Sequence, residues 1–149
     1  MRERNLTIYF TSDLHSYIYP TDYRSQAEKD LGLFKCASQF RKDGNTLVID
    51  GGDLLQGSPL GAFCHDTVGS AAQFAQIMNR CGYDYVTLGN HDFNYGMPYL
   101  DSYLDALRAR CVCENVRLDN GSIRFPARVH VLENGLRIGI VGIVTDYVN

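Results

Sequence analysis

Three consecutive polar residues, Asn90, His91 and Asp92, follow directly after an apolar run. Amide, imidazole and carboxylate groups are costly to bury unless another group pairs with them, so this cluster indicates a site rather than a core. A solvated turn explains the motif equally well when it is taken alone, because Gly, Asn and Asp are common turn residues. The rest of the chain decides between these two interpretations.

Two further polar clusters follow earlier apolar runs. Asp13 and His15 follow residues 6–11, and in an extended backbone the alternation of side chains sends both to the same side, as expected of two ligands of one metal ion. Asp53 follows residues 46–49, and the glycines before it allow the backbone to turn tightly. The alternative roles for Asp53 are those of a helix cap and a turn former.

Apolar runs and the helical spacings between them predict the elements that position these clusters. Residues 6–11 are apolar on both faces, which predicts a strand in a sheet covered on two sides. Asn134-Gly135 between two alternating runs predicts a hairpin. The predicted elements are strands at 6–11, 46–49, 85–88 and 111–113, helices at 27–42, 67–80 (with Thr67 as N-cap) and after 96, loops at 20–26 and 56–66, and hairpin strands at 123–132 and 136–144.

Strands and helices in alternation, followed by a hairpin, predict an α/β fold with a largely parallel sheet, right-handed helical crossovers and a C-terminal antiparallel addition. Ligands of such sheets bind outside the carboxyl ends of the strands, so the three clusters are expected at one edge. Oxygen donors combined with an imidazole suit Mn, Fe, Zn or Mg. The set of Asp, His, Asp and Asn therefore predicts a site for two divalent metal ions in which Asp53 bridges.

Composition excludes several other classes of protein. The 149 residues are 45% hydrophobic and 21% charged, which is typical of one globular domain and not of disorder, collagen or a coiled coil. A net charge of −3 without Lys or Arg runs argues against a nucleic acid polymer or an acidic membrane as partner. The absence of a signal-peptide core or membrane-length apolar run predicts a cytoplasmic location, with an extracytoplasmic one as the alternative if Met1 is not the native start. The five cysteines lack Cys-x-x-Cys spacing and are expected to be reduced.

Nearly the whole chain resembles the N-terminal part of the calcineurin-like metallophosphoesterases, in particular the branch of 5'-nucleotidases and 2',3'-cyclic-nucleotide 2'-phosphodiesterases. That resemblance implies the first part of an αββα sandwich. It rests on three motifs in order, namely Thr11-Ser12-Asp13-Leu14-His15-Ser16, Asp50-Gly51-Gly52-Asp53 with the following Gln56-Gly57-Ser58-Pro59, and Leu88-Gly89-Asn90-His91-Asp92-Phe93-Asn94-Tyr95-Gly96.

Phosphoester hydrolysis with two metal ions is the activity that the resemblance implies, and His91 would stabilise transition-state charge or protonate the leaving oxygen. Asn94 would orient His91. The nucleotidase branch usually has Asp at this position, so Asn94 favours the cyclic phosphodiesterases. The metal ligands implied are Asp13 and His15 for the first ion, Asp53 as the bridge, and Asn90 for the second ion.

In the family that the chain resembles, further histidines, including a Gly-His-x-His motif, complete both metal shells well downstream of the part that residues 1–149 match, and a base-binding C-terminal domain follows. Neither the motif nor that domain is found in residues 1–149. His65 and His130 sit in no such motif and are expected to be structural or surface residues. We therefore expect residues 1–149 to be part of a phosphoesterase domain with a nucleotide or another small phosphoester as substrate, impaired activity, and self-association through uncovered strand edges.

Two other interpretations stay open at this point. One is a metal-binding but catalytically incomplete α/β domain with a scaffolding or regulatory role. The other is a non-catalytic flavodoxin-like domain, which is disfavoured because no Gly-rich phosphate loop opens the first helix.

Overall fold

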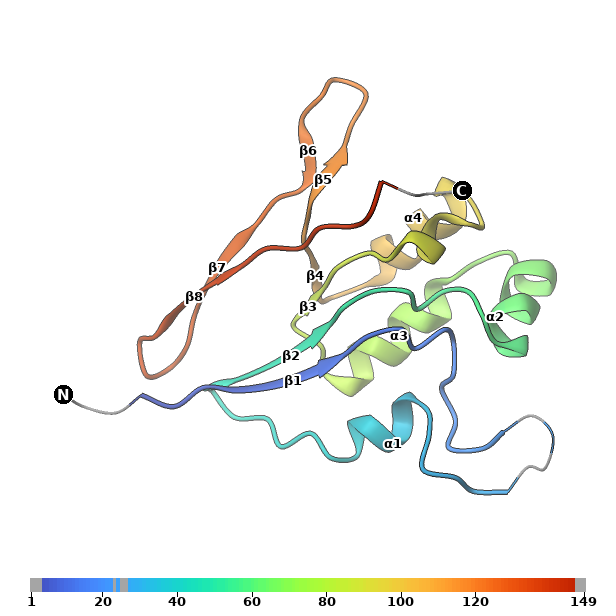
Figure 1. Cartoon of the computed structure of the whole chain (residues 1–149), viewed down its shortest axis with the longest axis horizontal. Helices are drawn as coiled ribbons and strands as arrows, with labels where there is room; N and C mark the ends of the chain where they lie inside the picture. The colour runs from blue at the N-terminus through green and yellow to red at the C-terminus, as the bar shows by residue number, and fades with distance from the viewer. Residues whose placement is uncertain (1–3, 23, 25–26, 147–149) are drawn as a thin grey trace.

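A parallel sheet lies at the centre of the computed structural model, which describes residues 4–22, 24 and 27–146. Within these residues the sheet has four strands in the order β1-β2-β3-β4 (Figure 1). All three pairings are parallel, as the alternation of strands and helices predicts. The strands are β1 (Thr7–Thr11), β2 (Thr46–Asp50), β3 (Tyr85–Val86) and β4 (Arg110–Cys111).

Helices cover one face of this sheet. Val48 and Val86 are buried in one cluster with Phe74, Met78 and Leu100 from the helices. Pro98 lies in the first turn of the last helix, where its missing N–H leaves no bond unmade. The helices are α1 (Leu33–Ala37), α2 (Pro59–Phe63), a π-helical turn (Cys64–Val68), α3 (Ala72–Cys81), a 3-10 helix (Asn90–Phe93) and α4 (Met97–Ala106).

Antiparallel strands form the last part of the described chain. β5 (Cys113–Arg117) pairs with β6 (Ile123–Phe125), and β7 (Arg128–Val131) pairs with β8 (Arg137–Ile140). The turn between β7 and β8 contains Asn134-Gly135, so the predicted hairpin is confirmed. It lies on the side of the sheet away from α1 and α3 (Figure 1). A second buried cluster joins the hairpin to the sheet through Leu47, Tyr85, Val112, Leu132 and Ile140.

Several predicted boundaries are wrong. Residues 27–42 form a helix only at Leu33–Ala37, and the predicted loop 56–66 contains α2, which Pro59 starts and the Ser58 hydroxyl caps. The predicted hairpin strand 123–132 is divided between β6 and β7, and Pro126, which has no N–H to donate, lies at the break.

Thr67 does not cap α3 but lies in the π-helical turn, and α3 begins at Ala72. Of the predicted loop 20–26, residues 23, 25 and 26 lie outside the described residues. The cysteines are free within the part of the chain that the structure describes, which agrees with the expectation of reduced thiols.

The face of the sheet opposite the helices is open beyond the hairpin. Phe10 of β1 is 63% exposed and Ile143 after β8 is 72% exposed. A hollow of about 310 Å³ lies between these residues and Val112. The prediction that residues 6–11 are covered on both sides is therefore wrong for the described residues, because nothing in them packs over this part of the face. None of the described helices is long and apolar enough to cross a membrane.

Asp50 at the end of β2 is a buried carboxyl group. It accepts hydrogen bonds from the Thr11 hydroxyl (2.5 Å) and from the N–H of Gly52 (3.0 Å). The Thr11 hydroxyl also meets the Tyr83 hydroxyl at 2.7 Å. Burial raises the pKa of Asp50 to about 7, although these two hydrogen bonds act in the opposite direction.

The stability of the fold is expected to depend on pH through Asp50. Its pKa in the folded chain lies above the ordinary value of 3.8, so the folded chain binds the extra proton and the free energy of unfolding falls as the pH rises toward 7. Asp50→Asn keeps an acceptor for Gly52 but cannot ionise. Between pH 5 and pH 8 the parent is expected to lose roughly 3 kcal/mol more stability than the variant in urea unfolding.

Asp119→Asn, at an exposed carboxylate, is the matched control and should follow the parent. Equal pH dependence in the parent and in Asp50→Asn would show that Asp50 is ionised throughout this range.

Candidate active site

Asp13, His15 and Asp53 converge at the carboxyl ends of β1 and β2. One ligand atom of each lies within 4.8 Å of the other two, and His15 Nε2 is 4.0 Å from Asp13 Oδ1. The Asp13 side chain is 66% exposed, whereas Asp53 is only 9% exposed. Two carboxylates and an imidazole at these distances fit a divalent cation such as Mn, Fe, Zn or Mg. The three residues thus lie together, as the sequence predicts, while their roles as metal ligands stay a prediction.

Left-handed backbone, not strand alternation, causes this convergence. β1 ends at Thr11, and the next residues leave the extended conformation, so the predicted reason for the juxtaposition is wrong. Left-handed φ angles are rare for residues with a side chain and cost of order 1 kcal/mol or more each. Four non-glycine residues adopt them here, namely Asp13 (55°), His15 (46°), Ser16 (60°) and Asp53 (59°).

Backbone hydrogen bonds hold these turns against each other. The N–H of Asp13 donates to the carbonyl of Gly52 (2.9 Å), and the N–H of His15 donates to the carbonyl of Asp53 (2.8 Å). They continue the pairing of β1 with β2 beyond the strands. The segments that carry the three ligands are therefore positioned by the sheet itself.

The imidazole of His15 is fixed by the main chain of the next loop. His15 Nδ1 lies 2.7 Å from the carbonyl oxygen of Gln56. A carbonyl only accepts, so Nδ1 carries the hydrogen and the neutral ring keeps its lone pair on Nε2. That nitrogen faces Asp13, as a metal ligand with a hydrogen-bonded outer nitrogen should.

Asp92 joins the loop after β2 to the loop after β3. Its carboxylate, 3% exposed, accepts hydrogen bonds from four backbone N–H groups at 2.9 Å, those of Asp53, Leu54, Leu55 and Gly89. Burial raises the pKa of Asp92, while the N–H donors act in the opposite direction. Sequence reasoning counted Asp92 in the polar cluster but gave it no role. The available signal was an acidic residue three positions after Gly89 at a helix start, which is the spacing of a capping box.

His91 lies beside the three ligands. Its ring is 5.4 Å from the ring of His15 between centroids, and its backbone N–H donates a hydrogen bond to Asp53 Oδ1 (2.8 Å). Asn94 Nδ2 lies 3.0 Å from His91 Nδ1, so the structure brings together the pair that the resemblance implies. Asn90 begins the 3-10 helix next to His91 and is partly exposed. Asp13, His15, Asp53, His91 and Asn94 thus lie together at one edge of the sheet, and Asn90 follows β3 at the same edge; its role as a metal ligand stays a prediction.

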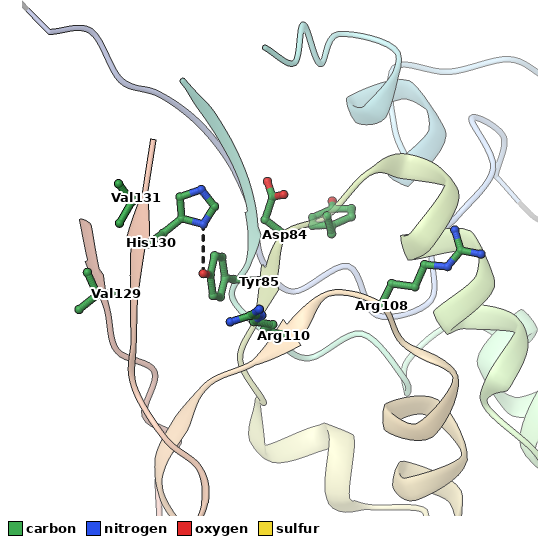
Figure 2. Close-up of a pocket in the computed structure, with 8 residues that line it drawn as sticks. Asp84, Tyr85, Arg108, Arg110, Val129, His130 and Val131 are labelled. Atoms are coloured by element: carbon green, nitrogen blue, oxygen red, sulfur yellow. Dashed lines mark hydrogen bonds between the residues drawn. The ribbon is translucent and has the colours of Figure 1, made fainter. Parts of the chain in front are cut away.

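The remaining histidines have structural surroundings. His65 stacks on Tyr95 with 4.0 Å between ring centroids, and its Nδ1 lies 2.7 Å from Asp66. His130 Nδ1 lies 3.1 Å from the Tyr85 hydroxyl, beside a hollow of about 400 Å³ (Figure 2). This hollow is at the start of β3, the opposite end from the site. Neither histidine belongs to the cluster formed by Asp13 and its two partners.

Residues 6–143 match the family of calcineurin-like phosphoesterases. The trifunctional nucleotide phosphoesterase protein YfkN of Bacillus subtilis is 34% identical, and the match covers 94% of this chain and 11% of YfkN. The 2',3'-cyclic-nucleotide 2'-phosphodiesterase/3'-nucleotidase of Haemophilus influenzae is 32% identical over 120 residues, covering 75% of this chain and 18% of that protein.

Solved structures give the same result. The calcineurin-like phosphoesterase YfkN from Bacillus subtilis superimposes with a TM-score of 0.74 at 32% identity, over 93% of this chain and 48% of that one. The NAD nucleotidase of Haemophilus influenzae gives a TM-score of 0.71 at 26% identity, over 95% of this chain and 26% of that one. The chain thus spans less than half the length of each of these relatives.

Asp92→Asn is expected to disturb the site although Asp92 is not a ligand. The amide has one acceptor oxygen, so about two of the four N–H groups would lose their partner. We expect the free energy of unfolding to fall by roughly 3 kcal/mol and the affinity for Mn²⁺ to fall with it. Urea unfolding and calorimetric titration with Mn²⁺ measure the two effects.

Asp105→Asn, at an exposed carboxylate of α4, serves as the control and should behave as the parent does. If Asp92→Asn left both the free energy of unfolding and the affinity for Mn²⁺ unchanged, the Asp92 side chain would hold the two loops as a neutral carboxylic acid rather than as a carboxylate.

Proposed function

The chain belongs to the calcineurin-like phosphoesterase family, a family of hydrolases, and from this premise we propose that it carries part of a two-metal centre for nucleotide phosphoesters. The observation that supports the proposal best is the convergence of Asp13, His15 and Asp53 beside His91. Relatives named as nucleotidases and cyclic-nucleotide phosphodiesterases support the choice of substrate class.

In this proposal Asp13 and His15 bind the first metal ion, Asp53 bridges, and Asn90 binds the second ion. Asp53 suits a bridge because hydrogen bonds hold it between both neighbouring segments. Its carbonyl oxygen accepts from the backbone N–H of His15, and its carboxylate accepts from the backbone N–H of His91. Two bound cations would lower the pKa of a water molecule and neutralise charge on the phosphoryl oxygens. Mn, Zn, Fe and Mg all suit this donor set.

His91 and Asn94 supply the proton chemistry of the proposed reaction. His91 would stabilise charge on the phosphoryl group or donate a proton to the leaving oxygen, and Asn94 would hold its ring in place. An amide at position 94 stabilises a charged imidazole less than a carboxylate would, which favours the cyclic phosphodiesterases as the nearer functional type.

A second candidate function is a metal-binding domain that is catalytically incomplete. It is favoured by the small ligand set, because Asp13, His15 and Asp53 form a cluster that His65 and His130 do not join. A divalent cation of this kind takes about five or six donors, so the described protein ligands leave both coordination shells incomplete. Elemental analysis of bound metal together with turnover of bis(p-nitrophenyl) phosphate separates the two candidates.

We also propose that copies of the chain associate through the open face of the sheet. Phe10, Val141 and Ile143 lie exposed on it, and such surface favours burial against a second apolar surface. The cytoplasmic location stays a prediction from the sequence.

Replacing His91 and Asp53 should separate catalysis from metal binding. His91→Ala is expected to retain bound Mn²⁺ but to lower turnover of the phosphodiester about a hundredfold, as loss of a group that stabilises transition-state charge or protonates the leaving oxygen does. Asp53→Asn is expected to lose bound metal and turnover together, because the bridging carboxylate serves both ions. Metal content after dialysis and initial rates are the two measurements.

His65→Ala is the matched control, since His65 lies outside the cluster and should affect neither quantity. Loss of metal from His91→Ala in proportion to activity would make His91 a ligand. Metal binding by a parent chain with no turnover would favour the incomplete domain.

A further inference from the structure

Gln56 touches both histidines of the site, one directly and one through Asn94. Its carbonyl oxygen lies 2.7 Å from His15 Nδ1. The oxygen of its side chain, Oε1, lies 2.6 Å from Asn94 Nδ2, and Asn94 in turn meets His91. Gln56 follows the buried segment 52–55 and is itself partly exposed. Gln56 is not one of the proposed metal ligands, yet its position allows it to influence the hydrogen bonding of both histidines.

The contact with Gln56 decides which end of the Asn94 amide faces His91. Gln56 Oε1 only accepts, so Asn94 presents its NH₂ group there. The same nitrogen is 3.0 Å from His91 Nδ1, so its second hydrogen is available to donate to that atom. His91 Nδ1 must then accept, and the neutral ring carries its hydrogen on Nε2.

Burial of the other end of the amide supports this orientation. Asn94 Oδ1 is buried and has no hydrogen-bond partner among the described residues. If the Asn94 amide were rotated by 180°, its NH₂ group would take the buried position that Oδ1 now holds. Two N–H donors would then lack a partner, where one acceptor lacks one now. Rotating the Gln56 amide as well would not change this count. In folded proteins, buried N–H groups without a hydrogen-bond partner are rarer than buried carbonyl oxygens without one. The observed orientation of the Asn94 amide is therefore the one with the lower free energy.

We propose that Gln56 is a positioning residue that fixes His15 and His91 in opposite tautomers, with the hydrogen on Nδ1 in His15 and on Nε2 in His91. Its main-chain carbonyl leaves His15 Nε2 as an acceptor, ready to bind a metal ion. Its side chain, through Asn94, makes His91 Nε2 a donor that faces the substrate. The second half rests on the proposed function. A neutral His91 then donates a hydrogen bond to a phosphoester oxygen without first gaining a charge.

Gln56→Glu and Gln56→Met form a matched pair for testing this role. A glutamate side chain only accepts, so it should hold the Asn94 amide in the same orientation. Methionine has a similar length but only a weak acceptor, so the Asn94 amide should lose its fixed orientation. Neither change removes the main-chain carbonyl that holds His15, which makes His15 an internal control for an intact loop.

The tautomers can be read without metal or substrate. Two-bond ¹H–¹⁵N correlation spectra of the ¹⁵N-histidine-labelled chain, at a pH where the rings are neutral, distinguish Nε2–H from Nδ1–H. The chain has four histidines, and His91→Ala assigns the signal of His91. We expect Nε2–H for His91 in the parent and in Gln56→Glu, a mixture in Gln56→Met, and Nδ1–H for His15 in all three.

An Nδ1–H tautomer of His91 in the parent, or identical His91 spectra in the parent and Gln56→Met, would overturn the proposal. Because this measurement involves no catalysis, its outcome is independent of whether the chain is a phosphoesterase.

Kinetics on the metal-loaded chain give the second readout. Gln56→Met is expected to lower kcat for bis(p-nitrophenyl) phosphate about tenfold with little change in KM, because the donor is misplaced while the binding groups stay. Gln56→Glu should restore kcat to nearly the parent value. Equal loss of kcat in both variants would contradict a positioning role, and an inactive parent with the expected spectra would count against the proposed function alone.

Discussion

One buried carboxylate, that of Asp92, connects the segments on which the site depends. It accepts hydrogen bonds from four backbone N–H groups, three in the loop after β2 and one at Gly89. A buried carboxylate is tolerable only when such donors replace the water it loses. In return, the peptide groups of residues 53–55 gain partners that no regular element gives them. Asp53, His91 and Gln56 all lie within or next to segments that this carboxylate holds.

Close approach of backbone makes that arrangement possible and limits which residues can occupy it. A Cβ atom added to Gly52 would lie 2.3 Å from the nitrogen of Gly89, and one added to Gly89 would lie 2.1 Å from Asp53 Oδ1. Both distances are far below van der Waals contact. The glycines of the two motifs are therefore needed for contact between loops. The left-handed turns at Asp13 and Asp53 persist because the neighbouring loop holds them in place.

The two faces of the sheet differ in what covers them. Helices close one face, and Phe74 and Met78 pack against its valines. The other face has the hairpin over its first part and exposed apolar side chains over the rest. The site lies where the strands end. Its proposed ligands are therefore held mainly by backbone hydrogen bonds between the loops, rather than by side chains packed on either face of the sheet. The chain covers less than half of each of the relatives compared above.

The sequence by itself determined the alternation of helices with the four strands of the parallel sheet, the hairpin at Asn134-Gly135, and the edge of the sheet at which Asp13, His15 and Asp53 lie. Apolar periodicity and strand direction are local properties that a pattern records directly. Only the tertiary structure decided how Asp92 and Gln56 act. Apart from Gly89, their partners lie 37 to 41 positions away along the chain, and no local pattern of side chains encodes such contacts. The left-handed turns likewise follow from contacts between loops that form only when the sheet has assembled.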